Sequence, residues 1–342
     1  MRRVILPHHI SDDPAPAGGV LRDFAGRSMG TSWSVRLVAA PTVTVSHLQQ
    51  GLQQQLDSVV AEMSHWESDS NLGRFNRAPA GSWHDLPPAF FDVLSFALDV
   101  ARASGGPCAG TLVNLWGFGP HGRFDQPDFI APTSDAIATA RAQLAAARKD
   151  MQLAPAPARR AFQPGGIELD LSAVAKGYGV DRLAYYLKSQ GIAHFVVEVG
   201  GELRGAGVKP DGQPWWVALE QVEQGQQGST DELVLALHGL AVATSGDYRR
   251  YFERDGVRYA HTIDPRSGLP ISNGLASVTV VHAQCMAADA WSTALTVLGR
   301  VDGLALAERQ GLAARLVERT IDHGHVSYHE YLSTHLRSML DE

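Results

Sequence analysis

The chain has 342 residues, of which 44% are hydrophobic and 19% charged, and this balance predicts a globular protein with a large core, either one large domain or two smaller ones. Its formal net charge of −7, without a visible basic stripe, argues against a protein that grips the phosphate backbone of nucleic acids. The two cysteines, Cys108 and Cys285, are too few for a disulfide framework, and we expect both to be buried thiols.

The first half of the chain predicts a flexible arm over residues 1–24, which are rich in turn formers, and then an alternating strand over 32–38. Helical spacing of apolar residues follows over 45–63 and 88–103. A glycine-rich loop over 105–120 separates these helices from an alanine-rich helix over 134–147.

The second half predicts a strand over 166–171, a helix over 175–190 and a strand over 194–199. Further strands are expected over 215–220, 233–237, 257–263 and 276–282, and residues 221–230 are polar enough for an exposed loop. Two helices over 286–298 and 301–310, separated at Gly299, complete a mixed α+β pattern.

The sharpest local pattern is the segment 288–294, in which Asp289 and Thr293 stand four residues apart and share one face of a helix among small residues. A carboxylate and a hydroxyl are oxygen ligands of the kind that Mg²⁺ prefers, together with waters and substrate phosphates. The alternative is an acid in the first helical turn beside a threonine that bonds its own helix.

The segment 170–181 places Asp170 at a strand end and Lys176 at the start of a helix. Free amides at a helix start favour anions, and the lysine adds a mobile positive charge for a phosphate. The alternative is a surface lysine that pairs with Asp170 or Asp181.

Two turn-rich segments, 244–248 and 261–270, carry hydroxyls, acids and His261. Their Asp-Pro and Ser-Gly pairs fix sharp turns and would hold His261 and Asp264 rigidly at the rim of a site. The alternative for Asp264 is a turn in which this side chain caps its own backbone.

Read together and in order, these segments resemble the ApbE family of FAD:protein FMN transferases from Met29 to Gly299, which is most of the chain. The matching pieces are Met29-Gly30-Thr31, Met63-Ser64 with Ser70 and Arg74-Phe75-Asn76, residues 112–119 (Leu-Val-Asn-Leu-Trp-Gly-Phe-Gly), 170–181, Gly200-Gly201-Glu202, 244–248, 261–270 and 288–293. The resemblance implies a two-lobed α+β fold with mainly antiparallel sheets flanked by helices and an active site between the lobes. It places one transferase domain over 25–342, with lobes at about 25–165 and 166–342.

The same resemblance implies a site for Mg²⁺ and FAD. The metal ligands would be Asp289, Ser292, Thr293 and the backbone carbonyl of Ala173. The FAD pocket would be lined by Met29, Trp66, Asn76, Gly105, Gly106, Pro107, Asp170, Lys176, Ser245 and His261. Asp289 and His261 would act in catalysis, with His261 orienting the acceptor or relaying its proton.

The implied reaction is the Mg²⁺-dependent transfer of FMN from FAD to a threonine or serine hydroxyl of a flavin-carrying redox subunit, with release of AMP. The alternatives are a Mg²⁺-dependent FAD pyrophosphatase that forms FMN and AMP, and a non-catalytic FAD-binding protein. No nucleic acid and no membrane-spanning segment are expected. No export signal is visible, so we expect a cytoplasmic location, with the periplasm as the alternative if this sequence is a trimmed form of a longer one.

One departure from the family pattern concerns the glycine-rich loop. Family members usually read Gly-Gly-Ala-Phe-Asp-Pro before the Leu-Val-Asn-Leu-Trp-Gly-Phe segment, whereas here Gly105-Gly106 runs directly into Pro107. Either Ala-Phe-Asp is deleted, or Gly105 and Gly106 replace the Phe and the Asp. In both cases a carboxylate is lost, so we expect that binding survives and that transfer is slowed or redirected.

Overall fold

A computed structural model describes residues 2–10, 13–106, 110–119, 124, 129–220, 232–246, 251–254, 257–322 and 325–341. The chain forms two compact units, each assembled from separate segments. Unit 1 consists of residues 1–58, 176–246 and 274–342, and unit 2 of residues 59–175 and 247–273. Each unit is an α+β structure, as the sequence predicts. The predicted lobe boundaries at 25–165 and 166–342 stay a prediction.

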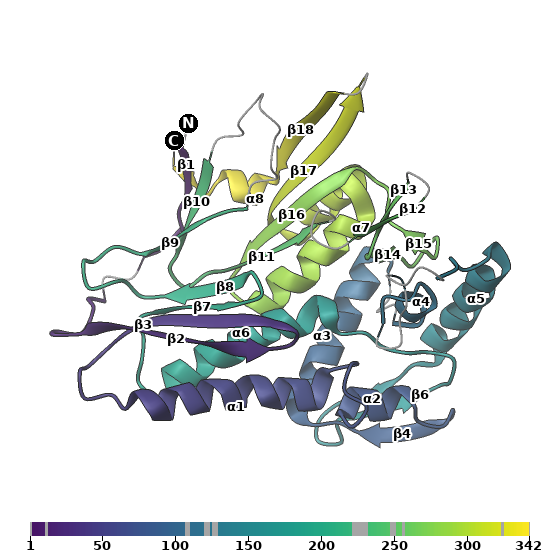
Figure 1. The fold of residues 1–342 in the computed structure, drawn as a ribbon, viewed down its shortest axis with the longest axis horizontal. Coiled ribbons are helices and arrows are strands. Elements are labelled where there is room, and N and C mark those ends of the chain that lie inside the picture. The colour runs from purple at the N-terminus through teal and green to yellow at the C-terminus, as the bar shows by residue number, and fades with distance from the viewer. Residues whose placement is uncertain are drawn as a thin grey trace. The chain divides into compact units, whose positions relative to one another are not determined.

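Unit 1 is built on an eight-stranded antiparallel sheet with the strand order β18-β17-β16-β11-β8-β7-β3-β2 (Figure 1). The strands are β2 (Val20–Ser28), β3 (Thr31–Ala39), β7 (Phe195–Val199), β8 (Glu202–Ala206), β11 (Ala241–Gly246), β16 (Leu275–His282), β17 (Ala313–Asp322) and β18 (His325–Leu332). The helices with residues in this unit are α1 (Val45–Met63), α6 (Ser172–Ser189), α7 (Cys285–Gln310) and α8 (Thr334–Arg337).

The sheet of unit 1 has an apolar cluster on each face, because successive side chains of a strand point to opposite faces. On one face, Trp33 and Leu37 of β3 pack with side chains of α1 and α6, which Figure 1 shows below β2 and β3. On the other face, Val38 packs with Ile5 and with a four-stranded sheet of order β19-β1-β10-β9. Its strands are β1 (Arg2–Ile5), β9 (Trp215–Ala218), β10 (Glu232–Leu237) and β19 (Leu340–Asp341).

The N-terminal segment differs from the predicted loose arm over residues 1–24. Strand β1 pairs with β10 and β19, and the side chain of Ile5 is fully buried. Strand β2 begins at Val20. Burial of one isoleucine and pairing on both edges outweigh the turn-forming composition of this stretch, a tertiary effect that local sequence does not reveal.

Unit 2 contains smaller elements. Its helices are α2 (Asn71–Asn76), α3 (Pro88–Ser104), α4 (Gly110–Leu115) and α5 (Ser134–Asp150). Its strands are β4 (Ser82–Asp85), β5 (Leu153–Ala154), β6 (Arg160–Gln163), β12 (Tyr251–Arg254), β13 (Val257–Ala260), β14 (Ile263–Asp264) and β15 (Leu269–Pro270). In both units, none of the described helices is long and apolar enough to cross a membrane.

Most helix predictions are confirmed and one strand prediction is wrong. The predicted helices match α1, α3, α5 and α6 within a few residues, and the break predicted at Gly299 is a non-helical residue (φ 81°, ψ 178°) inside α7. The strand predicted over 166–171 is absent from this fully described stretch. Asn76 Nδ2 donates to the carbonyl of Leu169 at 2.9 Å, and the amide of Leu169 donates to Asn76 Oδ1 at 2.9 Å. The carboxamide of Asn76 therefore bonds both backbone groups of Leu169, which a neighbouring strand would otherwise pair.

Ser333 provides a test of how unit 1 is closed at its C-terminal end. Its buried hydroxyl accepts from the amides of Ala314 (2.9 Å) and Leu336 (3.3 Å) and donates to the carbonyl of Leu312 (2.6 Å). We expect Ser333→Ala to lower the free energy of unfolding by about 1–2 kcal/mol, because it removes a helix cap and leaves buried backbone groups unpaired.

Urea unfolding measures this change. The exposed Ser338, whose hydroxyl donates only to the carbonyl of His335, is the matched control, and Ser338→Ala should change the free energy by less than about 0.5 kcal/mol. Equal effects of the two substitutions would contradict the assigned role of Ser333.

Candidate functional site

The acidic centre of unit 1 is Asp289, on the second turn of α7. Its side chain is 3% exposed, and its Oδ2 accepts a hydrogen bond of 2.9 Å from the backbone amide of Gly177 on α6. A Cβ at residue 177 would lie 2.4 Å from the carbonyl oxygen of Cys285 and 2.8 Å from Cβ of Asp289. Glycine at 177 is therefore what lets α6 approach α7 closely enough for this hydrogen bond.

Three hydroxyls form a directed chain beside Asp289. Ser292 Oγ donates to the carbonyl of Asp289 at 2.9 Å, Ser245 Oγ lies 2.8 Å from Ser292 Oγ, and Thr293 Oγ1 lies 3.0 Å from Ser245 Oγ. Since each hydroxyl has one proton, Ser245 must donate to Ser292, and Thr293 must donate to Ser245. Among the described residues, no further hydrogen bond engages the lone pairs of Thr293 Oγ1, whereas Ser292 uses its proton and one lone pair in these contacts.

The charges beside these three hydroxyls are unbalanced, because two buried acids, Asp289 and Glu202, face the single ammonium of Lys176. Lys176 Nζ donates to Glu202 Oε1, so the alternative in which this lysine pairs with Asp170 or Asp181 is wrong. Burial raises the pKa of Asp289, although Lys176 and the Gly177 amide oppose the shift. Burial and repulsion from Asp289 raise the pKa of Glu202 to about 7, against the lowering effect of Lys176. Burial alone would lower the pKa of Lys176, but Asp289 and Glu202 outweigh it and raise that pKa.

The N-terminus of α7 is held by a second acid, Asp181 of α6. Its carboxylate accepts from the amides of Cys285 (3.0 Å) and Met286 (2.9 Å) and pairs with Arg204 of β8. The residue that precedes α7, Gln284, makes no side-chain cap of its own. Asp181 therefore satisfies amides that would otherwise lack partners, and it places an anion where the helix dipole favours one.

Met29 lies in the two-residue turn between β2 and β3. Both Met29 (φ 52°) and Gly30 (φ 71°) have positive φ, as in the type I′ turn that suits a tight hairpin. A left-handed methionine is uncommon. A Cβ at Gly179 of α6 would lie 3.1 Å from Cε of Met29, so the side chain reaches the helix that carries Lys176.

In unit 2, Asp170 forms an Asx turn at the start of α6. Its Oδ1 accepts from the amide (2.8 Å) and the hydroxyl (2.6 Å) of Ser172 and lies 3.3 Å from Nδ1 of His65. The ring of Trp66, which is 59% exposed, lies 5.2 Å from that of His65, measured between centroids. Asp170 and Trp66 thus belong to one cluster, whereas the carboxamide of Asn76 is engaged with Leu169.

The loop that carries His261 is braced by a tryptophan. His261 lies partly buried between β13 and β14, and β14 pairs with β15. Trp116 Nε1 donates to the carbonyl of Gly268 at 2.8 Å. Asp264 Oδ1 accepts from the amide of Arg266 at 2.8 Å, so the interpretation of Asp264 as a cap of its own turn is confirmed.

The glycine-rich loop begins at the end of α3. Gly105 caps this helix in the left-handed conformation (φ 68°), and a Cβ at Gly106 would lie 3.2 Å from Cγ of Pro265. The predicted site residue Pro107, like Cys108, lies outside the described residues, whereas Cys285 is buried as predicted. Residues 110–115, expected within the loop, form helix α4.

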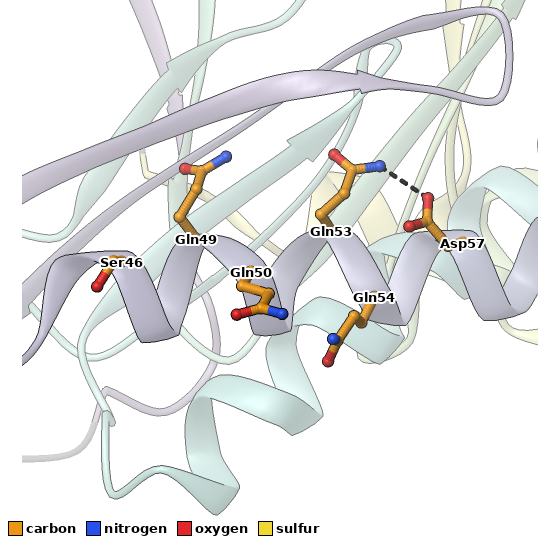
Figure 2. A pocket seen from close by; sticks show the side chains of 6 residues that line it. All are labelled: Ser46, Gln49, Gln50, Gln53, Gln54 and Asp57. Atoms are coloured by element: carbon orange, nitrogen blue, oxygen red, sulfur yellow. Dashed lines mark hydrogen bonds between the residues drawn. The ribbon is translucent and has the colours of Figure 1, made fainter.

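A surface hollow on α1 is lined by none of the predicted site residues. It is lined by Ser46, Gln49, Gln50, Gln53, Gln54 and Asp57 (Figure 2). Gln49 Nε2 donates to the carbonyl of Ala25 at 3.0 Å, and Gln53 Oε1 accepts from Trp33 Nε1 at 2.9 Å. The two side chains therefore tie α1 to β2 and β3, and we assign this hollow no chemistry.

The donors beside Asp289 fit a hard cation. Within the described part of the chain, no group of three His, Cys, Asp or Glu side chains could hold a metal, so an ion would also need hydroxyl, carbonyl, water or substrate oxygens. Mg²⁺ accepts such a mixed oxygen shell. The buried carboxylate of Asp289 and the hydroxyl oxygen of Thr293, four residues further along the same helix, are oxygen ligands of this kind.

The predicted site residues are distributed over both units. Unit 1 contains Met29, Lys176, Ser245, Asp289, Ser292 and Thr293, and unit 2 contains Trp66, Asn76, Gly105, Gly106, Asp170, Ala173 and His261. The roles predicted for them and the active site predicted between the lobes stay predictions. Sequence reasoning did not single out the roles of Gly177, Asp181 and Glu202, although all three lie in motifs it identified.

Comparison with known proteins identifies the class. A sequence profile described as the ApbE family matches residues 29–316, and the chain belongs to this family. A relative named FAD:protein FMN transferase from Vibrio cholerae serotype O1 is 35% identical over 93% of this chain and 92% of its own length. A transferase of the same name from Escherichia coli strain K12 is 32% identical over 92% of this chain and 88% of its own length.

Solved structures agree with this assignment. The apo flavinyl transferase ApbE of Pseudomonas stutzeri superposes with a TM-score of 0.82 at 35% identity and covers 94% of this chain and 97% of its own. The flavin transferase ApbE of Vibrio cholerae gives a TM-score of 0.83 at 34% identity, with coverage of 94% and 99%. The predicted family and fold class are therefore confirmed.

The contact between Gly177 and α7 predicts a severe effect of one methyl group. Gly177→Ala should destabilise unit 1 by about 2–4 kcal/mol, because its Cβ would meet backbone atoms that cannot move independently. Thermal or urea unfolding measures the loss.

Gly179→Ala is the matched control on the same helix. Its Cβ would meet only the ends of the Met29 and Leu56 side chains, which can shift, so we expect less than about 1 kcal/mol. A Gly177→Ala protein as stable as the control would show that α6 and α7 are not closely packed at this point.

Proposed function

We propose that this protein transfers FMN from FAD to a threonine or serine hydroxyl of another protein, forms a phosphoester bond and releases AMP in a Mg²⁺-dependent reaction. The proposal rests on the buried Asp289, the hydroxyls of Ser292, Ser245 and Thr293 beside it, and the neighbouring Lys176. These residues lie in a protein of the ApbE family. The names of the relatives support FAD as the donor and a protein as the acceptor.

Asp289, Thr293 and the carbonyl of Ala173 would hold the metal, which when bound neutralises negative charge on the diphosphate. The acceptor hydroxyl attacks the phosphorus on the FMN side, the bond from that phosphorus to the oxygen bridging to AMP breaks, and AMP leaves. Lys176 contributes a fixed positive charge to the diphosphate, which becomes more negative at the leaving oxygen.

His261 is proposed to orient the acceptor hydroxyl or to relay its proton. The loop from 261 to 270 suits this task, because its turn is fixed by the Asp264 cap and by the hydrogen bond from Trp116. A fixed loop lowers the entropy cost of presenting an imidazole to a second macromolecule. A small flavin-carrying subunit of a redox complex is the proposed class of acceptor.

Mass spectrometry tests the proposal directly. A threonine-containing acceptor peptide is incubated with the protein, FAD and Mg²⁺, and a mass gain equal to FMN is expected. Asp289→Asn should abolish the adduct, whereas Asp302→Asn, which removes an exposed acid from the same helix, should leave it unchanged. Metal-dependent AMP without an adduct would instead identify a pyrophosphatase, and bound, intact FAD would identify a binding protein.

The hydroxyl chain predicts a specific effect of Ser245→Ala. Without the Ser245 acceptor, the Thr293 proton is free to turn toward the metal, so the Mg²⁺ concentration for half-maximal AMP release should rise about tenfold. Thr244→Val, which removes a neighbouring hydroxyl bonded only to Thr279 at 2.9 Å, should leave that concentration unchanged. An equal rise in both variants would mean that the Ser245 hydroxyl does not orient Thr293.

A further inference from the structure

Glu202 is a buried acid whose position the fold alone does not explain. It is the first residue of β8, directly after the Gly200-Gly201 turn, and its side chain is 5% exposed. Oε1 accepts from Lys176 Nζ, while Oε2 is buried without a hydrogen-bond partner among the described residues. A carboxylate left half-satisfied in the interior costs stability, and a purely structural residue here could be apolar.

Lys176 is the other half of this pair. Its side chain is 34% exposed, and its ammonium is anchored by Oε1 of Glu202. A lysine ammonium has three donors on a flexible four-carbon stem, and Glu202 occupies one of them. Anchoring by Glu202 restricts the stem and leaves the other donors for a ligand.

Asp289 is the competing anion. It attracts the Lys176 ammonium electrostatically, and this attraction raises the pKa of Lys176, as do the charge of Glu202 and the hydrogen bond to it. The hydrogen-bonded partner of the ammonium is nevertheless Glu202. If Glu202 lost its charge, Asp289 would be the remaining carboxylate acting on the ammonium, and an Asp289 paired with Lys176 would be a poorer cation ligand.

We propose that Glu202 is a positioning residue that holds the Lys176 ammonium for an anionic ligand and prevents it from pairing with Asp289, so that Asp289 stays available to a cation. The inference rests on the proposed function, because it takes the FAD diphosphate as the anion and the divalent ion as the cation. Glu202 touches neither of them and acts through Lys176.

A double-mutant cycle tests the proposal with binding alone. The four proteins are the wild type, Glu202→Gln, Lys176→Met and the double variant. FAD affinity is measured by flavin fluorescence in EDTA, and metal affinity by the electron paramagnetic resonance signal of Mn²⁺, which shares the oxygen preference of Mg²⁺. With Lys176 present, Glu202→Gln should weaken FAD binding about tenfold and Mn²⁺ binding about fivefold. In the Lys176→Met background it should change either affinity by less than about twofold.

Two controls address folding and general charge effects. Glu198→Gln removes a partly exposed acid from the adjacent strand β7 and should change neither affinity. Glu202→Asp keeps the charge one methylene shorter and should recover part of the affinity that Glu202→Gln loses. Equal losses from Glu202→Gln with and without Lys176, or no loss at all, would overturn the proposal.

A ligand-free measurement separates this inference from the proposed function. The chain has four lysines, Lys149, Lys176, Lys188 and Lys209, so a protein labelled with ¹⁵N-lysine gives an interpretable ammonium spectrum. The Lys176 signal, assigned with Lys176→Met, should be slow in exchange in the wild type and shifted or lost in Glu202→Gln, while exposed Lys188 is unaffected. An unchanged Lys176 signal would overturn the positioning role. If the wild type shows this signal but has no affinity for FAD, the proposed function is overturned. The anchoring of the Lys176 ammonium by Glu202 would still hold.

Discussion

The hydrogen bond from the amide of Gly177 to the carboxylate of Asp289 is the contact on which the candidate site in unit 1 depends. It joins α6 to α7 at a point where any side chain larger than that of glycine would meet backbone atoms. It also fixes the helix face from which Asp289 and Thr293 project. The hydroxyl chain through Ser245 then connects this face to β11, so the sheet and two helices together determine where these side-chain oxygens lie.

Three buried acids of unit 1, Asp181, Asp289 and Glu202, differ in how far their charge is balanced. Asp181 pairs with Arg204 and accepts two amides at the start of α7, so its charge is balanced and its role is structural. Asp289 and Glu202 share a single ammonium, that of Lys176, and burial raises the pKa of both acids. A surplus of buried negative charge destabilises a fold unless it is neutralised, and this is the physical basis of the metal site proposed at Asp289.

Elements defined by their own periodicity could be predicted from the sequence, and those defined by distant partners could not. Helices α1 and α3 carry regular apolar spacing, and the break at Gly299 follows from one residue. The strand predicted over 166–171 is wrong because the backbone of Leu169 bonds to the side chain of Asn76, 93 positions away in sequence. No local sequence pattern can indicate such a distant partner. The spacing of Asp289 and Thr293 made the segment 288–294 a candidate site, whereas Glu202 was noted only within the Gly200-Gly201-Glu202 match. Its partner Lys176 lies 26 positions away, so a local pattern does not reveal the pair.

The backbone at the altered glycine loop favours one of the two alignments with the family pattern. Gly105 is left-handed, where a phenylalanine would be strained, and a Cβ at Gly106 would press on Pro265. Deletion of Ala-Phe-Asp is therefore physically simpler than replacement of the Phe and the Asp by these two glycines. A compensating carboxylate would then have to come from elsewhere. Asp170 is engaged with Ser172 and His65, and Asp264 with Arg266, so neither could take that part without giving up its present partner.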